Sequence, residues 1–298
     1  MLLSTTTREL NEKFGYKRAV EIIAEAGFDA VDLSLVSMRE DENIFNGDDY
    51  LYKAKELLKV AKANGVVFNQ SHSVYPTSFS DSQKSEKALD TVKRSIEVAA
   101  AVGAKIIVVH PVHHLHYVDG NNAEILKKMN YEFYSAILPL AEKHNIIIAT
   151  ENMWQRESGS RAIIDSVCSK GDEFCEYIDM MNSPYFTACL DLGHCGLVGQ
   201  RAEDMVRTLG NERLGAIHVH DNNGKEDNHV LPKTPWLNSI KWEEVLKALA
   251  EIDYRGDFTF ESEIFFRYVT EETAVSAARY MHDIGRMFIK KIENYKKA

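Results

Sequence analysis

The sequence has few of the features that mark secreted or membrane-spanning proteins. It holds only four cysteines, none of them in a Cys-x-x-Cys spacing. Residues 1–7 show neither the charged nor the apolar region of a secretory signal. No apolar run approaches the ~20 residues that a helix needs to span a bilayer. We therefore expect reduced thiols, a cytoplasmic location and no membrane partner.

Basic residues and prolines are also scarce. Thirty-five lysines and arginines stand against 45 aspartates and glutamates, which gives a net charge of −10. This charge argues against a partner held by its phosphates along an extended surface. With only 6 prolines and 45% hydrophobic residues, the chain can build one large core without a disordered tail. A length of 298 residues allows either two small domains or one large one, so the sequence pattern must decide.

A unit of helix, glycine and β-rich run recurs along the first third of the chain. Gly27, Gly65 and Gly103 each follow a helical stretch and precede an apolar run, and they lie 38 residues apart in both intervals. Glycine suits the left-handed position that closes a helix. The spacing is that of a βα unit.

Eight apolar runs alternate with helical stretches over the whole chain. The expected strands cover residues 2–6, 28–33, 66–69, 105–109, 146–149, 186–190, 214–219 and 258–260. Later helices are expected over about 123–143, 161–181, 202–209 and 242–252, and from 270 onward. The runs are too continuously apolar for a half-exposed antiparallel sheet and favour parallel strands buried on both faces. Eight βα units predict a single α/β domain over residues 1–298, a (β/α)8 TIM barrel, with a doubly wound open sheet as the alternative.

Six consecutive runs end in a histidine or an acidic residue, and in such a barrel the active site lies at these strand ends. The residues in question are His72, His110, Glu151, Asp191, His218 and Glu261. Carboxylates that converge to ~4 Å repel each other by about 4 kcal/mol at an effective dielectric near 20. They must therefore share protons or surround a cation.

Simpler interpretations exist for individual members. Asp191 could be the N-cap of the following turn. His110, which precedes Pro111, could be a packed loop residue. The neighbouring histidines at positions 113, 114 and 116 are expected in a solvated loop.

The acidic and imidazole groups together suit a divalent metal. The expected ligands are Glu151, Asp191, His218 and Glu261. Three carboxylates and one imidazole suit Mn²⁺, Mg²⁺, Co²⁺ or Zn²⁺, and Mn²⁺ is our first choice for a single ion. The residues expected around this centre are His72, His110, His194, Asp227 and His229. They could bind substrate hydroxyls or hold further metals, and Trp154 could cover the apolar side of a sugar or serve packing.

In this ordered set the chain resembles the xylose isomerase-like barrel superfamily, over essentially its full length. The motifs are Thr150-Glu151-Asn152, Leu190-Asp191-Leu-Gly-His194, His218-Val-His-Asp221-Asn, Asp227-Asn-His229 and Phe260-Glu261. Each motif is weak alone, whereas the ordered set is specific. The superfamily includes sugar and sugar phosphate isomerases and epimerases, and abasic-site endonucleases of the trinuclear-zinc type.

The resemblance to the ketose epimerase branch implies roles for particular residues. The four expected ligands would bind one metal, and Glu151 and Glu261 would also be the acid/base pair. The residues matching Glu157 and His194 would contact the substrate. An arginine that this branch places six residues after the metal-binding histidine is absent, because Gly224 stands there.

We therefore predict a metal-dependent isomerase or epimerase of carbohydrate metabolism, acting on a small sugar or polyol. Glu261 would remove a proton and Glu151 would return it, through a metal-bound enediolate. The loop over residues 262–267 has no glycine to grip a phosphate, which favours an unphosphorylated substrate. No nucleic-acid partner is expected, and assembly into a homo-oligomer is left open.

The alternative is a phosphodiesterase on abasic DNA with a multinuclear zinc site. The endonuclease branch holds three zincs with nine ligands, and each has a counterpart here: His72, His110, Glu151, Asp191, His194, His218, Asp227, His229 and Glu261. The net charge and the lack of loops rich in arginine, lysine and aromatic residues argue against DNA. A sugar-binding barrel without catalysis is a third class, which the retained glutamates disfavour.

Overall fold

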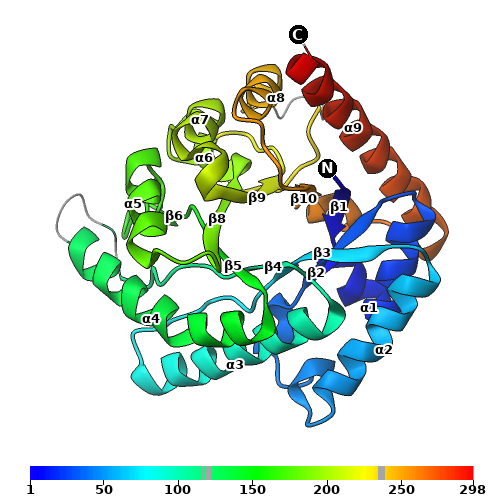
Figure 1. Cartoon of the computed structure of the whole chain (residues 1–298), viewed down its shortest axis with the longest axis horizontal. Helices are drawn as coiled ribbons and strands as arrows, with labels where there is room; N and C mark the ends of the chain where they lie inside the picture. Colours follow the sequence, from blue (N-terminus) through cyan, green and yellow to red (C-terminus); the bar gives the residue numbers. More distant parts are fainter. Residues whose placement is uncertain (116, 118–121, 234–238, 298) are drawn as a thin grey trace.

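A closed barrel of parallel strands forms the centre of the molecule (Figure 1). The computed structural model describes residues 1–115, 117, 122–233 and 239–297. The barrel order is β1-β10-β9-β8-β5-β4-β3-β2. Its strands are β1 (Leu3–Thr6), β2 (Ala30–Ser34), β3 (Val67–His72), β4 (Ile106–Val108), β5 (Ile147–Glu151), β8 (Phe186–Asp191), β9 (Leu214–Val219) and β10 (Phe258–Phe260). The predicted (β/α)8 barrel is confirmed, and the open sheet is excluded.

Helices surround the barrel (Figure 1). The long ones are α1 (Arg8–Glu25), α2 (Tyr50–Ala63), α3 (Ser82–Val102), α4 (Ala123–His144), α5 (Gly171–Met181), α7 (Ala202–Arg213), α8 (Trp242–Glu251) and α9 (Glu271–Lys297). Shorter turns are η1 (Val36–Arg39), η2 (Ile44–Asn46), α6 (Leu192–Leu197) and η3 (Glu263–Phe266). Gly27, Gly65 and Gly103 follow α1, α2 and α3 with φ of 99°, 74° and 87°, a region where glycine carries no Cβ penalty. The repeated glycine therefore closes each of these helices, as its spacing predicts.

A small apolar layer inside the barrel positions the polar strand ends. Its four fully packed members are Val108, Ala149, Cys189 and Ala216. Successive side chains of a strand point to opposite faces, so the residue two positions later points to the same interior. The residues at that position are His110, Glu151, Asp191 and His218. The barrel thus places one polar layer directly beyond an apolar one.

The helix predicted over residues 161–181 is wrong for its first ten residues. They contain β7 (Ile163–Asp165), which pairs antiparallel with β6 (Trp154–Arg156). Ile163 and Ile164 are β-branched and suit a strand, and Arg161 has a φ of 60° that does not fit a helix. The chain therefore inserts a hairpin after β5 before α5 begins.

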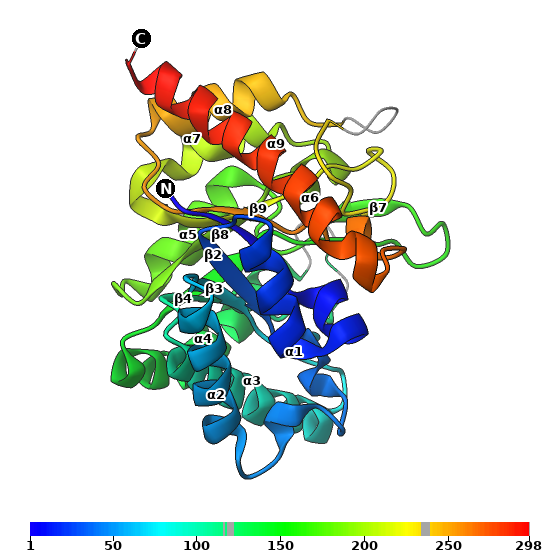
Figure 2. The same ribbon diagram turned by 90° about the vertical axis from the view of Figure 1, so that its right-hand side faces the viewer.

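Loops gather at one end of the barrel. Figure 2 shows β7 and the loop after β9 projecting from that end, while the N-terminus lies at the other. Among the described residues, no helix is both long and apolar enough to cross a membrane. His116 lies outside the described residues.

Candidate metal centre

Four side chains from four strands meet at the loop end of the barrel. Candidate ligand atoms of Glu151, Asp191, His218 and Glu261 all lie within 4.8 Å of one another. Nδ1 of His218 is 2.9 Å from Oε2 of Glu261 and 3.3 Å from Oε1 of Glu151. It is 4.0 Å from Oδ2 of Asp191. All four residues are buried, so water screens their charges weakly.

The two glutamates of this group are held in their ionised form. Burial alone would raise the pKa of Glu151, but the imidazoles of His218 and His110 outweigh burial and hold this pKa well below its usual value. Burial would also raise the pKa of Glu261, and again His218 lowers it. Within the described part of the chain, the ion pairs of both glutamates come from histidines rather than from lysine or arginine. The centre is thus a set of charged acids and imidazoles without a fixed cationic partner.

The Cys189 thiol lies close to His218 and Glu151, and without a metal it keeps its proton. Burial raises the pKa of this thiol to about 12. A thiol must lose its proton to bind a metal. The donor set is therefore made of oxygen and imidazole nitrogen, which fits a divalent cation such as Mn²⁺ or Zn²⁺.

Two further histidines extend the group on the side of Glu151. Nε2 of His110 is 2.9 Å from Oε2 of Glu151, and Nε2 of His72 is 3.7 Å from the same atom. The two Nε2 atoms are 3.0 Å apart. Glu151 thus stands between His218 on one side and the His72–His110 pair on the other.

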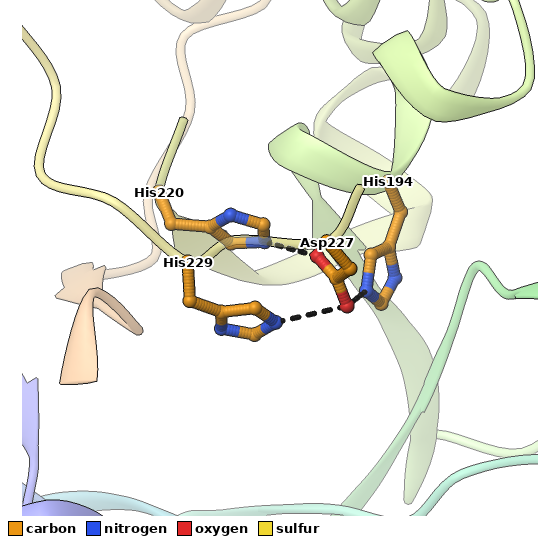
Figure 3. A group of neighbouring side chains, drawn as sticks. All are labelled: His194, His220, Asp227 and His229. Atoms are coloured by element: carbon orange, nitrogen blue, oxygen red, sulfur yellow. Dashed lines mark hydrogen bonds and ion pairs between the residues drawn. The ribbon is translucent and has the colours of Figure 1, made fainter. Parts of the chain in front are cut away.

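A third cluster contains His194, His220, Asp227 and His229 (Figure 3). Oδ2 of Asp227 lies 3.2 Å from Nε2 of His194 and 3.1 Å from Nε2 of His229. The rings of His220 and His229 stack at a centroid distance of 3.9 Å. Figure 3 shows the Asp227 carboxylate pointing between the three imidazoles. Together the three clusters bring all nine predicted metal ligands to one end of the barrel.

Three of these histidines are fixed by backbone carbonyl groups. Nδ1 of His72 is 2.9 Å from the Ser73 oxygen, and Nδ1 of His194 is 2.8 Å from the Asn152 oxygen. Nδ1 of His229 is 2.8 Å from the backbone oxygen of Glu261. Because a carbonyl only accepts, each Nδ1 carries the proton and donates it. Each Nε2 faces the cavity. Those of His194 and His229 donate to the Asp227 carboxylate here, and loss of that proton would leave the lone pair through which an imidazole binds a metal.

Asp191 serves as a helix cap and as a cluster member at once. Its Oδ1 accepts a hydrogen bond of 2.7 Å from the His194 backbone N–H, so it is the N-cap of α6. Nε2 of His220 lies 2.8 Å from Oδ1 and 2.9 Å from Oδ2 of Asp191. Asp191 therefore both caps α6 and belongs to the polar cluster, two roles that the sequence analysis gives as alternatives.

His220 is a site residue that the sequence interpretation omits. It lies two positions after His218, and the alternation of side chains along a strand could have placed it on the same face. It is fully buried. A Cβ on Gly193 would lie 2.0 Å from its ring, so glycine leaves the space that His220 occupies.

The clusters border a cavity of about 500 Å³, within the range of small-molecule sites. The predicted substrate-contact residues that line it are His72, His110, Trp154, His194 and His229. Glu157 is exposed on the hairpin, where it accepts a 2.5 Å hydrogen bond from Ser160, and does not line this cavity. Arg8 and Arg156 line the cavity without having been predicted.

The loop after β4 also differs from its prediction. His113 and His114 line the cavity instead of being fully solvated. The Tyr75 hydroxyl lies 3.2 Å from Nε2 of His113, and Ser78 lies 2.8 Å from Nδ1 of His114. These contacts turn the loop inward. Burial lowers the pKa of His113 to about 3, so its ring is neutral.

These features define a class: a (β/α)8 barrel with acidic and imidazole side chains gathered at its strand ends. The model of one family, the xylose isomerase-like TIM barrel, matches residues 20–283. The chain belongs to this family. The predicted resemblance is thereby confirmed.

Individual relatives are more distant. A D-psicose 3-epimerase from Enterocloster bolteae is 21% identical over 83% of this chain and 76% of its own. A crystal structure of a D-tagatose 3-epimerase-like protein superposes with a TM-score of 0.74 at 21% identity, covering 99% of both chains. The IolI protein with a bound zinc atom superposes with a TM-score of 0.73 at 16% identity, covering 97% of this chain and 99% of its own. Against two uncharacterized relatives, the chain spans 56% and 65% of their lengths.

Proposed function

We propose that the protein is a divalent-metal-dependent sugar isomerase or epimerase that works by proton transfer. The observation that carries this proposal is the convergence of Glu151 and Glu261 on one buried group with His218 and Asp191. Two glutamates in one buried polar group supply a base, when ionised, and an acid, when protonated. The names of two similar proteins, D-psicose 3-epimerase and a D-tagatose 3-epimerase-like protein, support a sugar as substrate.

The two glutamates come from different sides of the group. Glu151 ends β5 and Glu261 follows β10, with β8 and β9 between them in the barrel order. Glu261 takes the proton from the carbon next to the substrate carbonyl, and the C–H electron pair moves into the enediolate. Glu151, which takes up a proton from water when the substrate binds, delivers it to the other face of that carbon for epimerisation, or to the adjacent carbon for isomerisation. After each turnover Glu261 carries a proton and Glu151 has lost one. Proton exchange with solvent restores the starting state of both glutamates.

The metal would be held by Glu151, Asp191, His218 and Glu261. A divalent cation there supplies a Lewis acid that polarises the substrate carbonyl and stabilises the negative charge that develops on oxygen. We propose one ion, with Mn²⁺ as first choice. The zinc bound in the similar IolI structure supports a divalent metal without selecting its identity.

The substrate would be a small, unphosphorylated sugar or polyol. The proposed contacts are His72, His110, Trp154, His194 and His229, which line the cavity. The imidazoles can exchange hydrogen bonds with hydroxyl groups, and the indole can cover the apolar face of a sugar ring.

The test is exchange of solvent deuterium into a panel of ketoses by the Mn²⁺-loaded protein. We expect deuterium at the carbon next to the carbonyl, and a loss of about 10²–10⁴-fold in rate for Glu151→Gln and Glu261→Gln. Glu173→Gln, at a half-buried glutamate outside the cavity, is the matched control and should keep the rate. If the loaded protein exchanges deuterium into no ketose, the proposal fails.

A second candidate function follows from the convergence of all nine ligands. Three adjoining cation sites would suit hydrolysis of a phosphodiester in abasic DNA, because clustered metals activate water and hold the leaving oxygen. Elemental analysis of purified protein separates the two functions. One metal per chain supports the isomerase. Three zincs per chain, together with cleavage of an abasic duplex, would support the phosphodiesterase instead.

A further inference from the structure

His218 is oriented differently from the other histidines of the site. His72, His194 and His229 turn Nδ1 outward to a carbonyl and Nε2 inward. His218 turns Nδ1 inward, 2.9 Å from Glu261, and Nε2 outward. Its Nε2 lies 2.9 Å from Nε2 of the Gln70 amide, the nitrogen that a 180° rotation of the amide group would exchange for Oε1. Gln70 lies on β3 and His218 on β9, so this contact crosses the barrel interior.

The chemistry of the imidazole decides which group Gln70 must present. To bind a cation through Nδ1, His218 needs its lone pair there, so the proton must be on Nε2. A protonated Nε2 needs an acceptor. The amide group offers its carbonyl Oε1 as an acceptor, while its NH2 can only donate. A rotation of 180° about the terminal side-chain bond of Gln70 brings either group to His218.

A buried acid beside Gln70 favours the same orientation. Asp32 of β2 is the register partner of Gln70, so both side chains point into the barrel. Asp32 is fully buried, and neither of its carboxylate oxygens has a hydrogen-bond partner of standard geometry among the described residues. A buried acceptor without a donor is destabilising. An amide that turns Oε1 to His218 has its NH2 available for Asp32, and one side chain then satisfies both neighbours.

We propose that Gln70 is a positioning residue for the metal ligand His218, in a chain that runs from Asp32 through Gln70 to Nε2 of His218. Its carbonyl holds the proton on Nε2 and thereby keeps Nδ1 available to the cation. Asp32 fixes the amide in that orientation. This inference rests on the proposed metal centre, and it adds two residues on strands that contribute no ligand to that centre.

The experiment measures Zn²⁺ and Mn²⁺ affinity by competition with a chromophoric chelator. Gln70→Leu removes the acceptor and should weaken binding by about 10–100-fold. Its metal-free melting temperature should fall as well, because Asp32 loses its donor. Gln70→Glu keeps an acceptor but faces Asp32 with a second carboxylate, so it should lose less. The exchanged pair Asp32→Asn with Gln70→Glu restores one donor and one acceptor and should approach the parent affinity. Ser71→Ala, a buried neighbour on β3 whose hydroxyl donates to the Leu33 carbonyl, is the control and should not change affinity.

Proton-detected NMR of ¹⁵N-histidine-labelled, Zn²⁺-loaded protein gives a second measurement. It should show the proton of His218 on Nε2, assigned by its disappearance in His218→Gln. Parent affinity in Gln70→Leu, together with lost binding in His218→Gln, overturns the positioning role and leaves the metal centre intact. A parent that binds neither Zn²⁺ nor Mn²⁺ overturns both proposals. If Gln70→Leu does not fold, a folded but weakly binding exchanged pair also overturns the inference.

Discussion

Single residues at the site act through the groups that they hold in place. His220 contacts both carboxylate oxygens of Asp191 and stacks on His229. It therefore connects the four-residue centre to the cluster of Asp227. Its position depends on Gly193, because any larger residue there would overlap its ring.

Because His220 needs the space beside Gly193, adding one methyl group at Gly193 should displace it. In Gly193→Ala the new Cβ would lie 2.0 Å from Cε1 of His220, so the ring must move away from Asp191. We expect a loss of stability of about 1–3 kcal/mol and weaker metal binding, measured by denaturant unfolding and by chelator competition. Gly196→Ala on the same short helix meets only the Ser239 hydroxyl at 3.1 Å and should change little. Parent-like metal binding in Gly193→Ala would show that His220 does not position Asp191.

Glu173 makes stability depend on pH outside the site. Burial raises its pKa to about 7, despite a hydrogen bond from Tyr117. The unfolded chain releases this proton near pH 4.5, whereas the folded chain keeps it until about pH 7. The folded state therefore binds more protons in this window, and its stability falls as pH rises from 4.5 to 7.

Replacing Glu173 with glutamine should remove the fall in stability between pH 4.5 and pH 7, because an amide does not ionise. We expect Glu173→Gln to match the parent at pH 4 and to exceed it above pH 7 by about 1–3 kcal/mol, a figure reduced from the full linkage value because the side chain is partly exposed. Urea unfolding at the two pH values measures the difference. Equal gains at both pH values would contradict a role for ionisation.

The four predicted metal ligands share one property, because each lies at the end of an apolar run or directly after it. This rule selects Glu151, Asp191, His218 and Glu261, which the structure brings together. It does not select Gln70, which lies within a strand, or Arg8, which lies in α1. Their roles depend on which strands and helices become neighbours, and the local pattern does not contain that information.

At the scale of elements, periodicity predicts the barrel strands well and the insertion after β5 poorly. The strands over 214–219 and 258–260 begin and end as predicted. Of the β6–β7 hairpin, only β7 falls within the helix predicted over residues 161–181, and a strand of three residues is too short to show an alternation. Its pairing brings the Trp154 indole within 3.2 Å of Asp227, so the insertion contributes to the site.

The loop after β9 depends on one buried acid. Asp221 accepts hydrogen bonds from Trp242 Nε1 at 2.7 Å, from the Ser239 N–H at 2.9 Å and from the Asn222 N–H at 2.8 Å. Its backbone also pairs with Val230 across the loop. Asp227 and His229 lie between these two anchor points, so Asp221 sets the shape of the segment that carries them.

Removing that carboxylate should loosen the whole segment. Asp221→Ala leaves three donors without an acceptor, and we expect a loss of at least ~3 kcal/mol in denaturant unfolding. Asp221→Asn keeps one side-chain oxygen and should lose less. A loss below ~1 kcal/mol in the alanine variant would mean that the loop is held by other contacts.

At the scale of the whole molecule, the four central ligands belong to β5, β8, β9 and the end of β10. They lie on consecutive strands of the barrel order. A cation bound there connects one half of the closed sheet, and the unfolded chain cannot offer the same arrangement. The sequence predicts this architecture because eight buried runs with regular spacing permit few other folds. It does not predict which of three clusters binds a cation, since that depends on distances of a few ångströms.

Metal binding should therefore stabilise the entire barrel. A cation that binds only the folded chain adds about 2.7 kcal/mol at one hundred times its dissociation constant, and we expect Mn²⁺ to raise the melting temperature by several degrees and a chelator to reverse the rise. The Glu151→Gln/Glu261→Gln pair should lose this increment, because two of four ligands no longer carry charge. Glu173→Gln should keep it, since that residue lies outside the cavity. A rise that persists in the double variant would place the stabilising cation in the cluster of His194, Asp227 and His229 instead, and the proposed proton transfer would then lack its metal.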